Sequence, residues 1–202
     1  MTELLESLVV LDYLGIALFA VSGALVAAEK RHNLVTFAFF AVATAVGGGT
    51  IRDLLIDAPV FWVHQNTPMV VCLGAALLVW FLAKAHHAAK AIVWFDALGL
   101  VAYAVYGTEK ALRHEIAPVP ACLMGVMTAC AGGIIRDLLA QQPSILLRPE
   151  VYVTAAAVSA ATYAALLPFV APWVAALVAV ALGFLLRALA ITRGLSLPPY
   201  RR

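Results

Sequence analysis

Two arginine-aspartate pairs stand inside apolar stretches of this sequence, where charges are costly. Arg52 and Asp53 follow the run Gly-Gly-Gly-Thr-Ile, and Arg136 and Asp137 follow Ala-Gly-Gly-Ile-Ile. A charged side chain near the centre of a bilayer costs at least about 2.5–3.5 kcal/mol, so it normally faces a watery cavity or an opposite charge. The chemistry that these residues indicate is the attraction and repulsion of ions along a path through apolar surroundings.

Each arginine needs an opposite charge, and the aspartate beside it is a poor candidate because adjacent residues on a helix do not face each other. Asp12 and Asp96 occupy early positions in two other apolar stretches. We therefore predict two ion pairs, Asp12 with Arg52 and Asp96 with Arg136. The pairs either gate a path, since a paired arginine repels cations until it moves, or only lock the helices together.

The glycines before each pair are the second candidate feature. Each costs about 1 kcal/mol of helix propensity relative to alanine, which favours a bend or break in mid-span. The alternative is that small residues permit close helix packing. A threonine lies one turn before each glycine run, where it either lines a path or bonds its own backbone. These candidates are Gly47, Gly48, Gly49, Gly132, Gly133, Thr44 and Thr128.

The elements that must carry these residues are membrane-spanning helices. Of the 202 residues, 64% are hydrophobic and 12% charged, and the mean hydropathy is +0.99. A helix needs about 20 apolar residues to cross about 30 Å of hydrocarbon. Such stretches lie near residues 8–28, 34–56, 66–84, 91–112, 117–140, 150–168 and 171–190. The sequence therefore predicts an all-α integral membrane protein with seven transmembrane helices.

An internal repeat relates the two halves of the chain. A shift of 84 positions places residues 47–55 on 131–139 with seven of nine identities, and Asp12 on Asp96. Each copy holds three spans, an odd number, so the second must enter the membrane from the opposite side. We predict a first three-helix repeat at 8–84, an inverted second repeat at 91–168, and a seventh helix at 171–190.

Basic residues set the orientation, because Lys and Arg concentrate on the cytoplasmic side. With the N-terminus outside, only Lys110 and Arg113 fall in outside segments. The inside segments then hold nine basic residues, namely Lys30, Arg31, Lys84, Lys90, Arg148, Arg187, Arg193, Arg201 and Arg202. The C-terminus is accordingly expected in the cytoplasm.

The sequence offers little for other chemistry. We find no nucleotide-binding loop, nucleophile triad or metal-ligand spacing, so an enzyme, a metal site and a nucleic-acid partner are not expected. Cys72, Cys122 and Cys130 fall in apolar stretches and are expected to be packing residues. Ser22, Tyr103, Tyr106 and Lys110 are weaker candidates for lining the first and fourth spans.

The doubled Gly-Gly-x-x-Arg-Asp motif, the Asp-x-x-Gly sequences at Asp12 and Asp96, and the three-plus-three-plus-one arrangement resemble the prokaryotic trimeric intracellular cation channels, the TRIC family. The resemblance covers about Leu11 to Arg187. It implies a homotrimer in a bacterial inner membrane, with an ion path in each protomer, K+ as the main permeant ion and gating by basic residues near the kinks. It implies no cofactor beyond the permeant K+ or Na+ and bound lipid. The second motif has Ala131 in place of Gly47, so a weaker kink is expected in the fifth helix.

Two other functions remain open. A secondary transporter for glycine or another small zwitterion would use an arginine for the carboxylate and an aspartate for the ammonium. A non-conducting scaffold would use the charges only to hold the bundle.

Overall fold

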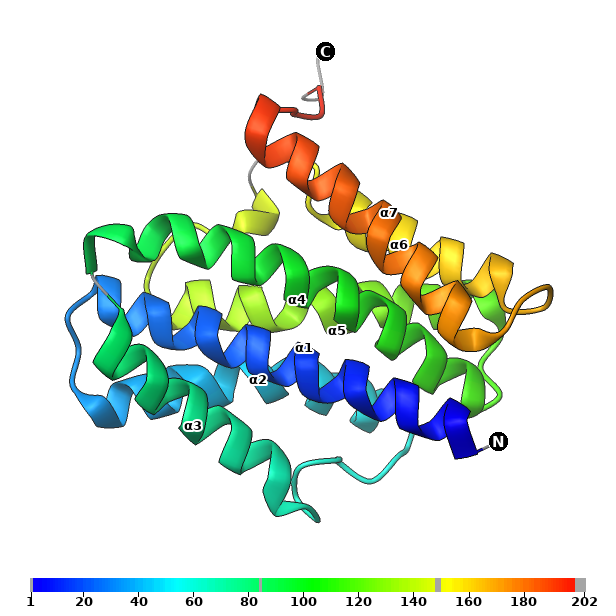
Figure 1. The fold of residues 1–202 in the computed structure, drawn as a ribbon, viewed down its shortest axis with the longest axis horizontal. Helices are drawn as coiled ribbons and strands as arrows, with labels where there is room; N and C mark the ends of the chain where they lie inside the picture. Colours follow the sequence, from blue (N-terminus) through cyan, green and yellow to red (C-terminus); the bar gives the residue numbers. More distant parts are fainter. Residues whose placement is uncertain (1, 84, 148–149, 199–202) are drawn as a thin grey trace.

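The computed structural model describes residues 2–83, 85–147 and 150–198, which are mostly helical (Figure 1). These residues form seven α-helices and one short 3₁₀ helix, so the predicted all-α class is confirmed. The helices are α1 Thr2–Glu29, α2 Leu34–Leu55, α3 Asn66–Leu82, α4 Ala85–Arg113, α5 Pro118–Leu139, η1 Ile145–Leu147, α6 Val153–Leu166 and α7 Pro172–Arg193. Four basic residues used to orient the chain, Lys84, Arg148, Arg201 and Arg202, lie outside the described residues.

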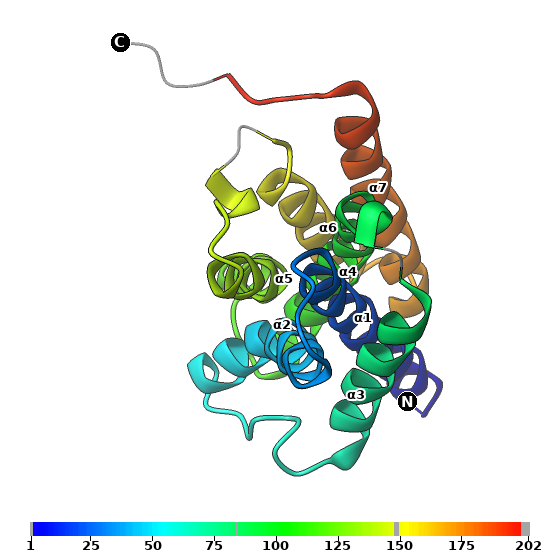
Figure 2. The ribbon, with the colours of Figure 1, turned by 90° about the vertical axis from the view of Figure 1, so that its left-hand side faces the viewer.

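Helices α1 and α4 form the centre of the bundle, where they lie side by side and run in opposite directions (Figure 1). Helix α2 packs on α1, α5 packs on α4, and α2 and α5 also contact each other. Around this group of four, α3 covers α1 and α2, while α6 covers α5 and α4 (Figure 2). Helix α7 lies on the far side, against α6 and α4. The candidate residues lie on α1, α2, α4 and α5, the four helices that pack together at the centre.

The two halves agree in local conformation as well as in sequence. Helices α2 and α5 begin and end 84 positions apart. The left-handed residues before them, Arg31 and Glu115, have φ of 56° and 60° and are also 84 positions apart. Asp57 and Gln141, which follow the two helices, both have φ of 54°. The same turns therefore begin and end the same helix in each half.

Five of the helical segments are long and apolar enough to cross a membrane. They are Val9–Glu29, Leu34–Leu55, Ala88–Arg113, Pro118–Leu139 and Pro172–Arg193. Helices α3 and α6 are apolar but shorter, with 17 and 14 residues. At 1.5 Å per residue, α6 is only about 21 Å long. The expected sixth span at 150–168 is therefore less helical than its apolar length suggests.

The distribution of side chains is that of a membrane protein. Large apolar side chains such as Phe81, Leu138 and Leu177 are exposed on the outside of the bundle. Polar and charged side chains are buried between the helices, where they can satisfy one another. The buried polar residues include Ser22, Thr44, Arg52, Asp53, Asp96, Thr108, Glu109, Thr128, Arg136, Asp137, Ser159 and Arg187.

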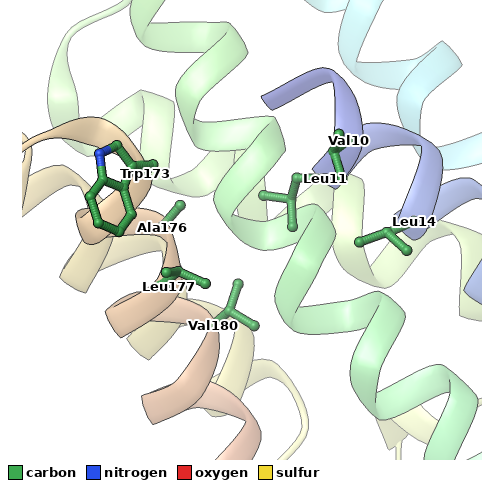
Figure 3. Close-up of a pocket in the computed structure, with 7 residues that line it drawn as sticks. All are labelled: Val10, Leu11, Leu14, Trp173, Ala176, Leu177 and Val180. Atoms are coloured by element: carbon green, nitrogen blue, oxygen red, sulfur yellow. The ribbon is translucent and has the colours of Figure 1, made fainter. Parts of the chain in front are cut away.

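An apolar groove separates the beginnings of α1 and α7 (Figure 3). Its volume is about 540 Å³, and α4 lies behind it. The lining residues are Val10, Leu11, Leu14, Trp173, Ala176, Leu177 and Val180. All of them are apolar in character, so the groove offers no polar side chain to an ion.

Glycines let α2 and α5 cross in close contact. A Cβ atom on Gly48 would lie 2.1 Å from the carbonyl oxygen of Thr128, and one on Gly132 would lie 2.4 Å from that of Thr44. These two contacts correspond under the shift of 84. Any larger residue at either glycine would push the two backbones apart.

The expected break in the two helices is not found, and the expected bend stays a prediction. Residues 34–55 and 118–139 are α-helical throughout, including the glycines. The loss of helix propensity is offset because the glycines allow the backbones of α2 and α5 to touch, which van der Waals packing favours in a membrane. The alternative considered from the sequence, close helix packing, therefore describes Gly48 and Gly132 better.

Replacing Gly48 by Ala should destabilise the protein, because the added Cβ would meet a backbone oxygen that cannot turn away. Overpacking of this kind costs about 1–3 kcal/mol. The matched control is Gly74→Ala, where nothing lies within 4 Å and alanine should be neutral or slightly stabilising. Thermal melts in one detergent compare the variants, and an unchanged melting temperature for Gly48→Ala would mean that the crossing is loose.

Candidate functional site

Arg52 lies at the centre of one buried charge cluster, near the end of α2. Its Nη2 atom lies 2.8 Å from Oδ1 of Asp53, and its Nε atom donates to the same oxygen at 2.9 Å. Lys110 of α4 reaches this oxygen too, with Nζ at 2.8 Å. The Arg52 guanidinium also lies over the Tyr106 ring, 5.2 Å from its centroid. We call Arg52, Asp53, Tyr106 and Lys110 the Arg52 cluster.

Arg136 holds a second cluster near the end of α5. Its Nη1 atom lies 2.5 Å from Oδ1 of Asp96 on α4 and donates to Oγ of Ser22 on α1 at 2.6 Å. Its Nη2 atom lies 2.8 Å from Oδ1 of Asp137. We call Arg136, Asp96, Asp137 and Ser22 the Arg136 cluster. The predicted pair between Asp96 and Arg136 is confirmed.

The other predicted pair, Asp12 with Arg52, is not among the ion pairs of the described residues, where Arg52 bonds to the neighbouring Asp53. Adjacent Cα positions on a helix face different directions, but the long Arg52 side chain bends sideways and reaches the Asp53 carboxylate. Asp12 is close enough to Arg52 for electrostatic attraction but forms no ion pair with it among the described contacts. It lines a cavity of about 350 Å³ together with Tyr106, Lys110 and other residues.

The aspartates of the two motifs also fasten the chain after each helix. Asp53 Oδ2 accepts a hydrogen bond from the backbone N–H of Phe61 at 3.1 Å. Asp137 Oδ2 accepts one from the N–H of Ile145 at 2.9 Å. The acceptors and the donors are each 84 positions apart. One carboxylate thus neutralises an arginine and holds a returning segment in both halves.

The two clusters differ in their balance of charge. The ion pairs of the Arg136 cluster join one positive and two negative groups, whereas those of the Arg52 cluster join two positive groups and one negative, with the Asp12 carboxyl close by. The position that corresponds to Lys110 in the first half is Val26. Although the halves share a backbone plan, their charged sites are therefore not equivalent.

The threonines and the remaining glycines lie between and beside the clusters. Thr44 and Thr128 are buried where α2 and α5 cross. Thr128 Oγ1 donates to its own helix, to the Met124 carbonyl at 2.6 Å, as threonines often do in apolar helices. Gly47 faces the Ile135 side chain and Gly49 faces the Phe61 ring.

Gly133 makes room for the Arg136 cluster. A Cβ atom there would lie 2.8 Å from the Tyr152 hydroxyl, 3.2 Å from Asp96 Oδ1 and 3.7 Å from Arg136 Nη2. The glycine is therefore needed for the side chains around Arg136 to meet.

A third charged group was missed by sequence reasoning. Glu109 of α4 accepts a short hydrogen bond from the Tyr163 hydroxyl of α6 and one from Nε of Arg113 at 2.6 Å. The signal in the sequence was a glutamate within an apolar span, which requires a partner. Its partner could not be identified, because Tyr163 is 54 positions away and has no charge.

Arg187 was assigned to the inside segments but is buried. It lies on α7 and pairs with Glu150, with Nη2 and Oε2 2.8 Å apart. The sequence indicated this burial only through the position of Arg187, six residues before the end of α7 and still inside an apolar helix. In the described part of the chain, no group of three or more His, Cys, Asp or Glu side chains is placed to hold a metal ion.

Comparison with known proteins places this geometry in a family. The family model described as "Glycine transporter" matches the chain twice, over residues 9–84 and 93–168. The matches are offset by the same 84 positions, and each covers one set of three helices. The UPF0126 inner membrane protein YadS of Escherichia coli is 40% identical over 159 residues, which are 76% of each chain.

Solved structures agree with this assignment. The TRIC trimeric intracellular cation channel orthologue from Rhodobacter sphaeroides has a TM-score of 0.87 and 41% identity, covering 93% of this chain and 98% of its own. A prokaryotic TRIC channel crystallised in 0.5 M KCl has the same TM-score at 27% identity, covering 93% and 96%. On these matches, and on the doubled motif that builds the two clusters, the chain belongs to the prokaryotic family of trimeric intracellular cation channels.

Proposed function

We propose that this chain is a monovalent cation channel that passes K+, with one ion path in each protomer of a homotrimer. The observation that carries the proposal is the pair of buried arginine clusters on the ends of α2 and α5, on either side of a glycine crossing. Relatives that are named as trimeric cation channels support both the ion and the assembly. Native mass spectrometry of the purified protein measures the number of subunits.

The ion path runs between α2 and α5 and is closed at their crossing. The contact of Gly48 with the Thr128 backbone leaves no room for even one added carbon atom, so an ion passes only when the helices separate. Asp53 and Asp137 supply negative charge on the two sides of the crossing. Arg52 and Arg136 oppose cations until they move with their helices.

Selectivity between K+ and Na+ is expected to be weak. The sequence contains no Thr-Val-Gly-Tyr-Gly segment of the kind that builds a ring of carbonyl oxygens around K+. The charge of the clusters then selects cations over anions and does little to separate one monovalent cation from another.

The proposed topology has seven spans, with α1–α3 and α4–α6 inserted in opposite orientations in a bacterial inner membrane. Support comes from the three helices in each half and from the name of the Escherichia coli relative. With the N-terminus outside, the Arg52 cluster lies toward the outer face and the Arg136 cluster toward the cytoplasm. The apolar exterior, including the groove beside α7, is covered by lipid.

Single cysteines at matched exposed positions test this topology. Lys30 and His114 correspond under the shift of 84, as do Pro59 and Pro143, and all four side chains are exposed. In a cysteine-free background, we expect a membrane-impermeant maleimide to label positions 59 and 114 from outside the cell. Positions 30 and 143 should react only after the membrane is opened. Labelling of both members of either matched pair from the same side would exclude an inverted arrangement.

Ion currents test the activity. In a planar bilayer, the purified protein should give unitary K+ currents that reverse near the K+ equilibrium potential in a KCl gradient. The name of the matching family model favours a second candidate, a glycine transporter. Saturable uptake of labelled glycine into proteoliposomes, with no unitary currents, would support the transporter and refute the channel.

Arg52→Ala should raise K+ flux, because it removes a buried positive charge that opposes cations and leaves Lys110 as the one cation paired with Asp53 in the described residues. We expect about a tenfold increase, equivalent to about 1.4 kcal/mol. Potassium efflux from proteoliposomes measures the effect, and Arg193→Ala, an exposed arginine near the end of α7, is the matched control. A less stable Arg52→Ala protein with unchanged flux would indicate that the cluster is only a scaffold.

A further inference from the structure

A buried arginine outside the repeated halves approaches the Arg136 cluster. Arg187 belongs to α7, which has no counterpart in either set of three helices, and its residue is only 1% exposed. One side of its guanidinium pairs with Glu150. The guanidinium also lies over the Tyr152 ring, with Cζ 5.3 Å from the ring centroid. A guanidinium stacks on an aromatic face in this way because it is planar and weakly hydrated.

Tyr152 carries the contact from Arg187 to the Arg136 cluster. Its hydroxyl reaches the space left by Gly133, the position that Asp96 and Arg136 also approach. Tyr152 and Asp96 are each 1% exposed, so this region is sealed from the bulk solvent. The residues from Arg187 to Arg136 thus form one continuous set of contacts from α7 through the start of α6 to α4 and α5.

This connection exists in one half only. The position that corresponds to Tyr152 is Pro68, which has neither a ring face for an arginine nor a hydroxyl. The Arg52 cluster is held instead by Lys110 and Tyr106, both from α4. Among the described residues, the stacked arginine that ties α7 to a charge cluster is therefore found at the Arg136 cluster.

The atoms left without partners in this region indicate that the set is held by shape as much as by hydrogen bonds. Within the described residues, Nε and Nη1 of Arg187 have no hydrogen-bond partner, and the Tyr152 hydroxyl lies beside the Asp96 carboxylate. An unpaired buried polar group costs about 1–3 kcal/mol. Removal of one member would leave further buried polar groups unpaired, which favours the entry of water.

We infer that Arg187 is a positioning residue, which holds Tyr152 against Asp96 and Arg136. In this way it keeps closed the mouth of the path, by which we mean the end of the path at the Arg136 cluster. The link between α7 and the cluster is independent of what passes through the path. Its effect on K+ flux rests on the proposed function.

Cys130 provides a reporter that does not depend on flux. It is buried and lies close enough to Asp96 and Tyr152 to interact with both electrostatically. In a Cys72→Ala, Cys122→Ala background it is the remaining cysteine of the chain. The protein is placed in lipid nanodiscs, where both faces are accessible, and the rate of modification by a water-soluble methanethiosulfonate is measured.

Arg187→Met should raise the Cys130 modification rate at least about fivefold, the lower end of the coupling found between linked sites. The matched control is Arg193→Met, an exposed arginine on the same helix, which should leave the rate unchanged. Arg187→Lys keeps the charge for Glu150 but loses the planar contact with the ring. The lysine variant should fold and give an intermediate rate. The inference can therefore still be tested if the methionine variant does not fold.

A double variant tests the route. If Arg187 acts through Tyr152, Arg187→Met combined with Tyr152→Leu should modify no faster than Tyr152→Leu alone, whereas additive increases would overturn that route. A lower melting temperature for Arg187→Met with an unchanged Cys130 rate would make Arg187 merely structural and end the inference.

Potassium efflux from proteoliposomes of the same variants separates the two proposals. We expect faster efflux for Arg187→Met than for the wild type and for Arg193→Met. An absence of efflux from the wild type would refute the channel. The Cys130 modification rates would still show whether Arg187 positions the Arg136 cluster. Efflux from the wild type that Arg187→Met does not change would refute control of the path by α7 and leave the channel standing.

Discussion

A guanidinium cannot remain buried among apolar helices without a carboxylate, and much of this structure follows from that constraint. Arg52 and Arg136 are each 2% exposed, and each is neutralised by the aspartate that follows it. Because each of these aspartates also accepts a backbone N–H from the returning segment, the ion pair determines where the chain goes after α2 and α5. Each aspartate thus offsets the cost of the buried arginine and stabilises the helix end and its connection.

The same constraint explains why the glycines are in the helices. If α2 and α5 were apart, water or lipid would reach the arginines from the crossing. Gly48 and Gly132 instead bring the two backbones into contact, so the charge clusters lie in a sealed interior. Separation of these helices would hydrate both clusters, which provides a physical basis for coupling a change of helix packing to ion passage.

Much of this arrangement could be predicted from the sequence. The α2 bounds, the equivalence of the halves and the Asp96 pair with Arg136 all followed from apolar length and from the shift of 84. The failures share one cause, since they depend on side-chain reach or on distant segments. The contact of Arg52 with Asp53 depends on how a long side chain bends, and the partners of Glu109 and Arg187 are residues far away along the chain. Hydropathy also overestimated the length of α6, because an apolar segment need not be helical at its ends.

The departures from symmetry matter more for mechanism than the symmetry itself. A duplicated backbone with two identical clusters would present the same charge and the same restraints at both mouths. Here the position of Val26 in the first half corresponds to Lys110 in the second, which reaches the Arg52 cluster. The position of Pro68 corresponds to Tyr152, whose ring brings α7 into contact with the Arg136 cluster. The Arg52 cluster is therefore joined by an ammonium from within the repeated helices, and the Arg136 cluster by a contact with a helix added outside them. In the proposed channel, a stimulus that moves Arg187 on α7 would act on the Arg136 cluster through Tyr152, a contact that the other half lacks.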